Sequence, residues 1–244
     1  MHRFFLPKAF SPVMTITGMD AHHIKDVLRL QAGDQVQVVA DDGITALGTI
    51  TAVTTGSISL ACTRLETGSH EPRVRLALAQ GLAKGEKMEW VIQKAVELGA
   101  SIIYPVAMRH AVVQLDAAQA AKKVQRWQKI AETAAKQCKR DLVPQVAPVQ
   151  TLDEVLQADA SQLKLLAYES EQQVSLKAVL EAHPDVTSVL VIIGPEGGLA
   201  ETEVEEAMAA GAISVSLGRR ILRTETAGMV ALAAILYASG DLGL

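Results

Sequence analysis

The sequence predicts an α/β protein in which a large parallel sheet covered by helices follows a small β-rich part. After Pro72, short apolar segments alternate with amphipathic helical patterns, as expected of a parallel sheet with helices on its faces. Before Pro72, short strand patterns dominate. Aromatic residues make up only 3% of the chain, so its core is expected to be aliphatic, as in Val-, Ile- and Leu-rich parallel sheets.

The N-terminal part is predicted to be a small β-barrel over residues 1–70. Alternating patterns predict strands at 35–39, 46–50 and 57–62, with a hairpin turn at Asp41-Asp42-Gly43 and a short helix near 21–28. Residues 66–72 are polar, contain Gly and Pro, and separate two different periodicities, which is typical of a linker. The second domain is therefore predicted to span residues 73–244.

In the second domain the apolar segments and helical patterns follow one another in order. The predicted strands are 74–79, 102–106, 163–168, 189–193 and 213–217. The predicted helices are 87–98, 117–139, 176–182, 201–210 and 225–239. Gly99, Gly211 and Gly240 each follow a helix end, as C-terminal capping glycines do. Thr224 is predicted to be the N-cap of the last helix.

Two of these predicted strands each continue into a glycine turn. The strand at 189–193 is followed by Gly194-Pro195-Glu196-Gly197-Gly198, and the strand at 213–217 by Gly218 and a run with three arginines in five residues, 219–223. Ligands of open α/β sheets bind at the carboxyl ends of strands, and glycine permits close backbone approach. One such turn would be an ordinary connection; two turns, expected side by side, favour a ligand pocket walled by backbone.

The usual nucleotide motifs are absent from these turns. No Lys-Ser or Lys-Thr pair follows the glycines at 194–198, so this is not a Walker loop. The spacing also differs from the G-x-G-x-x-G dinucleotide motif. Neither phosphate-transfer chemistry nor an ordinary Rossmann cofactor is therefore indicated.

The run 194–198, together with Leu217-Gly218-x-Arg220-Ile221-Leu222-Arg223-x-Glu225-Thr226-Ala227, resembles the SPOUT methyltransferases and, more closely, their RsmE family. The resemblance covers essentially the whole chain, since Met1-x-Arg3-Phe4-Phe5 matches the family's opening and 87–99 its first long helix. The chain departs from the family at 108–110, Met-Arg-His in place of Glu-Arg-Ser, and at 135–137, Ala-Lys-Gln in place of Ala-Glu-Gln.

The resemblance implies more than the periodicity shows. It implies a C-terminal trefoil knot, a PUA-like N-terminal barrel, S-adenosylmethionine as cofactor, and methylation of N3 of one uridine in 16S ribosomal RNA, within the small ribosomal subunit. It also implies a homodimer. The cofactor is expected to contact the turns and a neighbouring strand, at Leu166, Gly194, Pro195, Gly198, Leu217, Gly218, Ile221, Leu222 and Thr226.

The proposed chemistry needs a group that stabilises negative charge on the target base. N3 of uracil is a poor nucleophile until its weakly acidic proton departs, and cationic hydrogen bonds to the uracil oxygens would stabilise the resulting anion. Arg223 is the first candidate for this role and Arg109 the second. Glu196 and Glu225 are candidates for the general base by location alone.

The helix at 117–139, extended to residue 140, carries a row of cations on one face and apolar residues on the opposite face. The cations are Lys122, Arg126, Lys129, Lys136 and Arg140. An exposed lysine row is often only solvated surface, but five cations with no acid on their stripe repel one another, and an RNA backbone would relieve this repulsion. The predicted RNA-binding residues are Arg3, Lys25, Arg29, Arg126, Lys129 and Arg140.

The last helix carries a stripe of small residues, Ala227, Ala231, Ala234 and Ala238, with Gly228 beside them. Alanine is favourable in any helix, so such a stripe can be incidental. A complete stripe nevertheless lets another backbone approach closely. It is interpreted as a contact with the knot or with a second subunit.

Composition excludes several other classes. The net charge of −4 argues against general coating of nucleic acid, so RNA binding must come from local patches. Cys62 and Cys138 form no metal or disulfide motif, and the adjacent His22 and His23 lack a second ligand pair, so no metal is expected. No signal peptide is recognised, and the longest apolar stretch, 229–238, is too short to span a bilayer, so a soluble cytoplasmic protein without membrane contact is expected.

Two other functions stay open at this stage. One is a SPOUT enzyme that methylates a ribose 2′-hydroxyl or a tRNA base. The other is a non-catalytic ribosome-assembly factor that keeps the fold.

Overall fold

The computed structural model describes residues 1–66 and 69–242, which form two compact units. The smaller unit consists of residues 1–71 and 135–143, and the larger of 72–134 and 144–244. The sequence did not predict that 135–143 would join the smaller unit. Two residues of the predicted linker at 66–72 lie outside the described residues.

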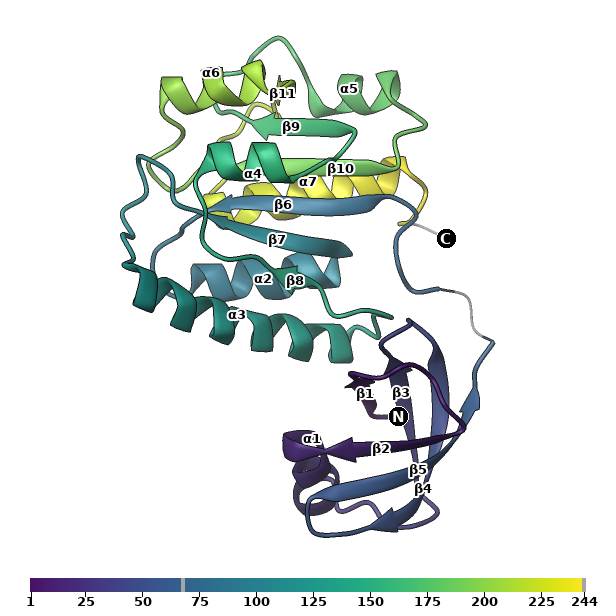
Figure 1. The fold of residues 1–244 in the computed structure, drawn as a ribbon. Coiled ribbons are helices and arrows are strands. Elements are labelled where there is room, and N and C mark those ends of the chain that lie inside the picture. The colour runs from purple at the N-terminus through teal and green to yellow at the C-terminus, as the bar shows by residue number, and fades with distance from the viewer. Residues whose placement is uncertain (67–68, 243–244) are drawn as a thin grey trace. The chain divides into compact units, whose positions relative to one another are not determined.

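The smaller unit is a curled five-stranded sheet in the order β1-β3-β4-β5-β2 (Figure 1). Its strands are β1 (Arg3–Leu6), β2 (Val13–Thr17), β3 (Gln35–Ala40), β4 (Thr45–Val53) and β5 (Ser57–Arg64). Two short helices, α1 (Gly18–His22) and the π-helix η1 (His23–Val27), replace the single predicted helix. The sequence reading missed β1 and β2, although it found the other three strands. Phe4, Ile24 and Leu60 belong to the cluster of buried apolar side chains in this sheet.

The larger unit contains a six-stranded sheet in the order β11-β9-β10-β6-β7-β8, and all its paired strands are parallel. The strands are β6 (Arg75–Gly81), β7 (Ala100–Val106), β8 (Gln145–Val146), β9 (Leu163–Ala167), β10 (Ser188–Ile193) and β11 (Ala212–Val215). The predicted parallel sheet is confirmed, with each of its five predicted strands present. The two-residue strand β8 was not predicted.

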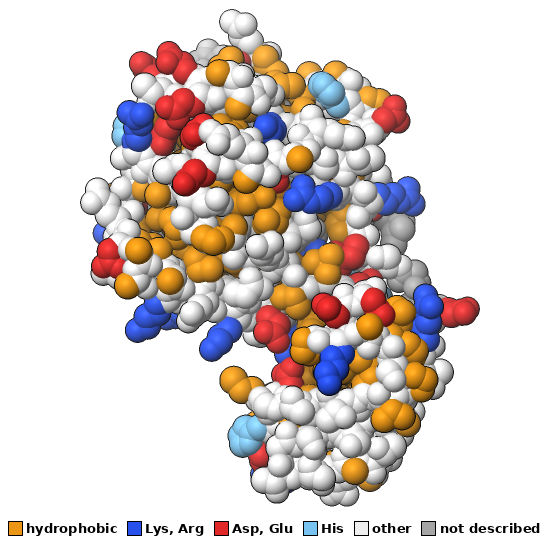
Figure 2. Space-filling view, viewed as in Figure 1, with side chains coloured by type: hydrophobic (Ala, Val, Ile, Leu, Met, Phe, Trp, Pro, Cys, Tyr) orange, Lys and Arg blue, Asp and Glu red, His pale blue; other side chains and the backbone are white. Residues whose placement is uncertain are grey.

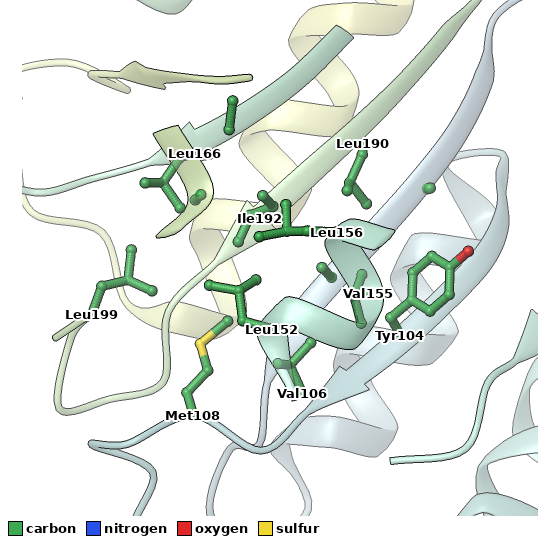
Figure 3. Close-up of a cluster of buried hydrophobic side chains, with 14 of the residues drawn as sticks. Tyr104, Val106, Met108, Leu152, Val155, Leu156, Leu166, Leu190, Ile192 and Leu199 are labelled. Atoms are coloured by element: carbon green, nitrogen blue, oxygen red, sulfur yellow. The ribbon is translucent and has the colours of Figure 1, made fainter. Parts of the chain in front are cut away.

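Helices cover both faces of this sheet (Figure 1). The helices after residue 72 are α2 (Lys87–Glu97), α3 (Ala117–Gln137), α4 (Leu152–Ala158), α5 (Leu176–Ala182), α6 (Glu201–Ala209) and α7 (Thr224–Ala238). On one face α4 and α6 pack together, and Leu152 and Val155 of α4 meet Leu190 and Ile192 of β10 in an aliphatic core (Figure 3). On the other face α7 packs against α2, β6 and β10.

The helix ends test the capping predictions. Gly99, Gly211 and Gly240 have φ values of +81°, +84° and +78°, so the three predicted C-terminal caps are confirmed. The prediction for Thr224 is wrong: Arg223 is the N-cap, and Thr224 is the first helical residue. Helix α4 was missed, although the Thr151 capping box with Glu154 marks its start in the sequence.

Two small residues of α7, Gly228 and Ala231, pack within their own chain. A Cβ at Gly228 would lie 3.4 Å from Leu78 Cδ1 and 3.6 Å from Ile193 Cγ1, so Gly228 lets α7 approach the sheet. Ala231 is also buried. The interpretation of these two positions as a contact with a second subunit is therefore corrected.

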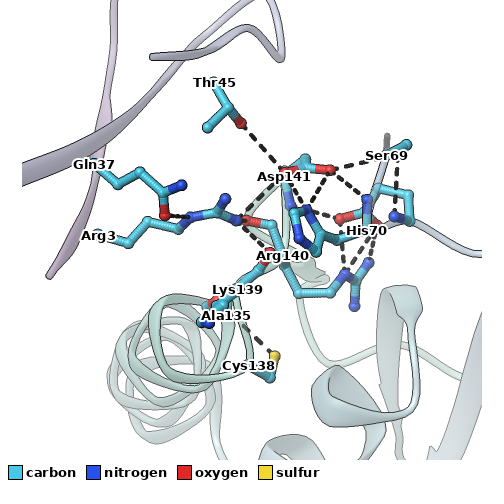
Figure 4. Close-up of polar contacts among 11 residues, drawn as sticks. Arg3, Gln37, Thr45, Ser69, His70, Ala135, Cys138, Lys139, Arg140 and Asp141 are labelled. Atoms are coloured by element: carbon cyan, nitrogen blue, oxygen red, sulfur yellow. Dashed lines mark hydrogen bonds and ion pairs between the residues drawn. The ribbon is translucent and has the colours of Figure 1, made fainter. Parts of the chain in front are cut away.

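A polar network ties residues 139–141 to β1 within the smaller unit (Figure 4). The Arg3 side chain is buried and donates hydrogen bonds to the carbonyl oxygens of Lys139 and Arg140. Its guanidinium also lies 3.3 Å from the Asp141 carboxylate. Arg140, equally buried, donates from Nε to both Glu71 oxygens at 2.9 and 2.8 Å. Both arginines therefore hold the segment after α3 in place.

Asp141 is the acceptor at the centre of this network. It receives the backbone N–H of His70 at 2.6 Å and the Thr45 hydroxyl at 3.3 Å. Burial alone would raise the pKa of Asp141, but the hydrogen bonds from His70 and the charge of Arg3 hold that pKa below its ordinary value. The carboxylate is thus stabilised in its charged form.

We expect the Asp141→Asn variant to lose about 1–3 kcal/mol of unfolding free energy at neutral pH, because the buried Arg3 loses its anionic partner. A depressed carboxyl pKa stabilises the fold above the pKa of the unfolded chain, and this contribution is lost as the pH falls through the folded-state pKa. The difference from the unmodified protein should therefore shrink towards acidic pH in urea unfolding. Asp185→Asn, at an exposed position, is the control; equal stability of both variants at neutral pH would refute the role of Asp141.

Candidate functional site

A cavity of about 590 Å³ lies in the larger unit at the carboxyl ends of β9, β10 and β11. This volume is within the range of small-molecule sites, ~300–1,000 Å³. Its walls are the two glycine turns predicted from the sequence, at 194–198 and at 216–222, together with the first residues of α7. The prediction that both turns line one pocket is confirmed.

The two turns are not on neighbouring strands, because β9 lies between β10 and β11. The expectation that the turns lie side by side is therefore corrected. The end of β9 fills the space between them, and Ala167, Tyr168 and Glu169 line the cavity there. The sequence reading missed Tyr168 and Glu169, since the order of strands in a sheet has no local signature.

The first turn is held by close backbone approaches that only glycine permits. A Cβ at Gly81, the last residue of β6, would lie 2.5 Å from the Pro195 nitrogen. A Cβ at Gly197 would lie 2.6 Å from the carbonyl oxygen of His110. Loops after β6 and β7 therefore meet the turn directly, and larger side chains at these glycines would push them apart.

The structure brings together most of the predicted cofactor residues. Those that line the cavity are Gly194, Pro195, Gly198, Leu217, Gly218, Ile221 and Leu222. Leu166 does not line it: its side chain is fully buried in the aliphatic core, since it points to the α4 and α6 face of the sheet (Figure 3). Thr226, in the first turn of α7, is also outside the lining.

Lys87 stands between two carboxylates on the wall of the cavity. Its Nζ is 3.0 Å from Glu196 Oε1 and 3.4 Å from Glu225 Oε2. The hydrogen bond to Glu196 raises the pKa of the Lys87 ammonium. Burial would raise the pKa of Glu196, but the backbone N–H of Lys84 and the Lys87 ammonium lower it overall. Lys87, which the sequence analysis placed only in a family motif, is thus part of the site.

The two catalytic candidates differ in position. Arg223 lines the cavity and is exposed, and its guanidinium has no ion pair within the part of the chain that the structure describes. Arg109 is not at the cavity: its guanidinium lies 3.7 Å from Glu206 on α6, and its backbone N–H donates to Glu203. The assignment of Arg109 to catalysis is therefore corrected, because its side chain is directed to another helix.

The predicted RNA-binding residues fall into a buried group and an exposed group. Arg3 and Arg140 are buried in the polar network described above, so they cannot offer charge to RNA, and both assignments are corrected. Lys25, Arg29, Arg126 and Lys129 are exposed.

The row of cations on α3 is shorter than predicted. Arg126 pairs with Glu89 of α2 at 2.8 Å, and Lys136 pairs with Asp20 of α1 at 3.0 Å, so the prediction that the row is unpaired is wrong at these two positions. Lys122 and Lys129 are exposed and have no ion pair with any described residue. Figure 2 shows Lys and Arg side chains standing out from the surface over α3. Within the predicted row, these two lysines are the exposed cations that no described acid pairs with.

No group of three His, Cys, Asp or Glu side chains suited to a metal ion occurs within 1–66 and 69–242. In the same described ranges, every helix is too short or too polar to cross a membrane.

Comparison with known families agrees with this geometry. Residues 70–236 match the family model for an RNA methyltransferase domain, and residues 16–61 match that for an RNA methyltransferase PUA domain. Fold and site thus define an RNA methyltransferase with a PUA domain. A Bacillus subtilis protein named ribosomal RNA small subunit methyltransferase E is 38% identical over 93% of this chain and 91% of its own length. The chain belongs to the ribosomal RNA small subunit methyltransferase E family.

Two solved structures extend the comparison. A Neisseria gonorrhoeae ribosomal RNA small subunit methyltransferase E bound to S-adenosyl methionine is 32% identical, with a TM-score of 0.86 over 97% of both chains. A putative methyltransferase from Legionella pneumophila in complex with the same cofactor is 30% identical, with a TM-score of 0.85 over 97% of both chains.

Gly218→Val is expected to weaken S-adenosylmethionine binding strongly, because Gly218 has φ +113° and faces the cavity, where a branched side chain would strain the turn and occupy ligand space. Isothermal titration calorimetry measures the change. Gly211→Val is a matched control: Gly211 has φ +84°, has open space at the position of its Cβ, and lies outside the cavity. The control should lose comparable stability and keep its affinity. Unchanged affinity in folded Gly218→Val protein would place the cofactor elsewhere.

Proposed function

We propose that this chain transfers a methyl group from S-adenosylmethionine to N3 of a specific uridine in 16S ribosomal RNA. The observation that carries the proposal is the cavity itself. Both of its walls are the glycine turns that characterise the family, and two relatives of the same fold, 32% and 30% identical to this chain, bind this cofactor.

The residues of the cavity suit the cofactor. We place adenine and ribose against the backbone groups of Gly194, Leu217, Gly218, Ile221 and Leu222, with Pro195 and Gly198 beside them. Glycine and turn backbone leave N–H and C=O groups accessible, so recognition needs few side chains. Bound there, the cofactor supplies an electrophilic methyl group on a sulfonium, and the protein supplies orientation and electrostatics.

Arg223 is assigned to the target base. It stands at the N-cap of α7 on the rim of the cavity, exposed and without an ion pair among the described residues. A guanidinium in this position can donate to a uracil oxygen and stabilise the negative charge that appears when N3 loses its proton.

Glu169, Glu196 and Glu225 all line the cavity, and the last two flank Lys87, where Glu225 is the candidate proton acceptor. Glu196 already accepts hydrogen bonds from the Lys84 N–H and the Lys87 ammonium, both at 3.0 Å, which lower its pKa and its basicity. Glu225 Oε2 is buried and has no hydrogen-bond donor among the described residues; the Lys87 ammonium at 3.4 Å is an ion-pair partner only. We therefore assign removal of the N3 proton to Glu225.

RNA contacts are assigned to both units. Lys25 and Arg29 offer exposed cations on the smaller unit, whose sequence matches an RNA methyltransferase PUA domain. Arg126 and Lys129 do so on α3. A base can reach the cavity only after it leaves its stack, which costs roughly a few kcal/mol that these contacts must offset. We infer that the substrate is 16S RNA within the small ribosomal subunit, in the cytoplasm.

We also infer the trefoil knot and a homodimer. The start of α7 bonds to the first glycine turn, since the Thr224 hydroxyl donates to the Gly194 carbonyl at 2.6 Å, which supports interlocked turns. Exposed apolar side chains on the packed pair α2 and α7, namely Trp90, Val230 and Tyr237, support a subunit contact.

The function is tested with purified protein, small ribosomal subunits from cells that lack the enzyme, and methyl-labelled cofactor. We expect label in 16S RNA, and nuclease digestion with mass spectrometry should identify one N3-methyluridine. The Arg223→Gln variant should transfer label ~100-fold more slowly, the size typical for a lost oxyanion donor, with unchanged cofactor affinity. A 2′-O-methyl product or a labelled tRNA would replace the proposed substrate, and no label at all would indicate a non-catalytic assembly factor.

The α3 surface is tested by the double variant Lys122→Glu and Lys129→Glu. We expect weaker RNA binding. The slope of log K against log salt concentration should also fall in magnitude by roughly 0.7–0.9 for each phosphate that the protein no longer neutralises. Lys177→Glu on α5, an exposed lysine of the same unit, is the control. Filter binding at several salt concentrations measures the affinity and the slope for each variant. An unaltered slope in the double variant would make this face ordinary surface.

A further inference from the structure

Behind the first glycine turn lies a short chain of buried hydrogen bonds that the proposed chemistry does not use. Gln80, on β6, is completely buried, and its Nε2 donates to the Thr224 hydroxyl at 2.8 Å and to the Gly81 carbonyl at 3.2 Å. The Thr224 hydroxyl, also buried, donates in turn to the Gly194 carbonyl at 2.6 Å. The chain thus links β6, α7 and the turn at the cavity.

The direction of these bonds follows from their chemistry. An amide Nε2 can only donate, so the hydroxyl must accept from it, and its single proton is left for Gly194. The opposite orientation of the Gln80 amide would set its oxygen against the Gly81 carbonyl oxygen. The hydrogen bonds therefore run in one direction, from Gln80 to the turn.

The Thr224 hydroxyl acts on a peptide that has a single polar backbone group. The Gly194–Pro195 peptide has no N–H, so its carbonyl is the one polar backbone group that can set its rotation. Gly194 itself has no Cβ to restrict its backbone dihedrals. Rotation of this peptide would move the wall of the cavity at Gly194 and Pro195.

The stability of the fold does not explain why a glutamine stands at position 80. Gln80 Oε1 is buried and has no hydrogen-bond partner among the described residues, although the other buried residues of β6 are apolar or glycine. A buried amide oxygen without a partner destabilises the fold, whereas an apolar residue here would not. This destabilisation indicates a role at the cavity.

We propose that Gln80 and Thr224 are positioning residues, which hold the Gly194–Pro195 peptide in the orientation that the cofactor requires. This inference rests on the proposed function, since it assumes that the cavity binds S-adenosylmethionine. Thr224 acts through its hydroxyl, which donates to the Gly194 carbonyl, and not as a helix cap, because Arg223 is the N-cap of α7.

The test compares Thr224→Val, which removes the hydroxyl but keeps the shape, with Thr224→Ser, which keeps the hydroxyl. We expect the valine variant to bind S-adenosylmethionine roughly tenfold more weakly in calorimetry, the effect of about one buried hydrogen bond. Its KM for the cofactor should rise by a similar factor while kcat at saturation changes little. The serine variant should restore the affinity of the unmodified protein.

Two further variants separate positioning from stability. Gln80→Leu should also weaken cofactor binding, yet keep or raise the melting temperature, because it removes the unpartnered oxygen. Tyr104→Phe deletes another buried hydrogen bond of the same sheet, to Asp159 at 3.1 Å outside the cavity, and should lower the melting temperature without a change in affinity.

Two results would overturn the inference alone. One is unchanged affinity in Thr224→Val and Gln80→Leu while the unmodified protein binds the cofactor. The other is an equal loss of affinity in Tyr104→Phe, which would trace the effect to general stability. Absence of binding by the unmodified protein would instead overturn the proposed function, and this inference with it.

Discussion

The contact between the end of β6 and the first glycine turn is the constraint on which the site depends. A Cβ at Gly81 would lie 2.5 Å from the Pro195 nitrogen, so the two backbones touch where any other residue would separate them. Because of this contact, the segment after β6 runs along the turn. It brings the Lys84 N–H and the Lys87 ammonium to Glu196, each at 3.0 Å. The charged wall of the cavity therefore follows from a backbone contact, and not from a charged motif in the sequence.

The cations of this chain serve two different purposes, which a helical wheel cannot separate. Lys122 and Arg140 fall on the same stripe of the extended α3 helix, yet Arg140 is enclosed and paired with Glu71 while Lys122 stays exposed. Burial of a guanidinium is tolerated only where acceptors meet it, as Glu71 and the carbonyls of residues 139 and 140 do for Arg140 and Arg3. With a net charge of −4, the chain as a whole does not attract RNA, so any attraction must come from local groups of exposed cations. The fold therefore decides which of these cations stay exposed.

The local sequence pattern predicted most helices and strands of this fold, but not which of them lie next to one another. The five main strands of the large sheet, its long helices and three glycine caps follow from periodicity and residue chemistry within a few positions. The order of the strands does not, and this is why Tyr168 and Glu169 were missed: β9 enters between β10 and β11 only in the folded sheet. The side chain of Leu166 lies in the aliphatic core, while the next residue of β9, Ala167, lines the cavity, and this division also depends on the folded sheet. Arg109 was misplaced because its partner, Glu206, is distant in sequence.

Recognition by backbone explains why the first glycine turn needs buried polar groups around it. Glycines have no side chains that could fix a turn. Its conformation must therefore be held by hydrogen bonds from neighbouring elements. At its beginning, the Gly194 carbonyl accepts from Thr224, which Gln80 orients. Beyond its end, the buried Glu203 accepts the N–H of Ala200 at 2.9 Å and that of Arg109 at 2.8 Å, so it joins the start of α6 to the loop after β7. The turn is thus fixed on both sides by long-range hydrogen bonds inside a unit whose core is mainly aliphatic. The glycine part of the wall can then consist of backbone, while side chains such as Lys87 and Arg223 line other parts of the cavity.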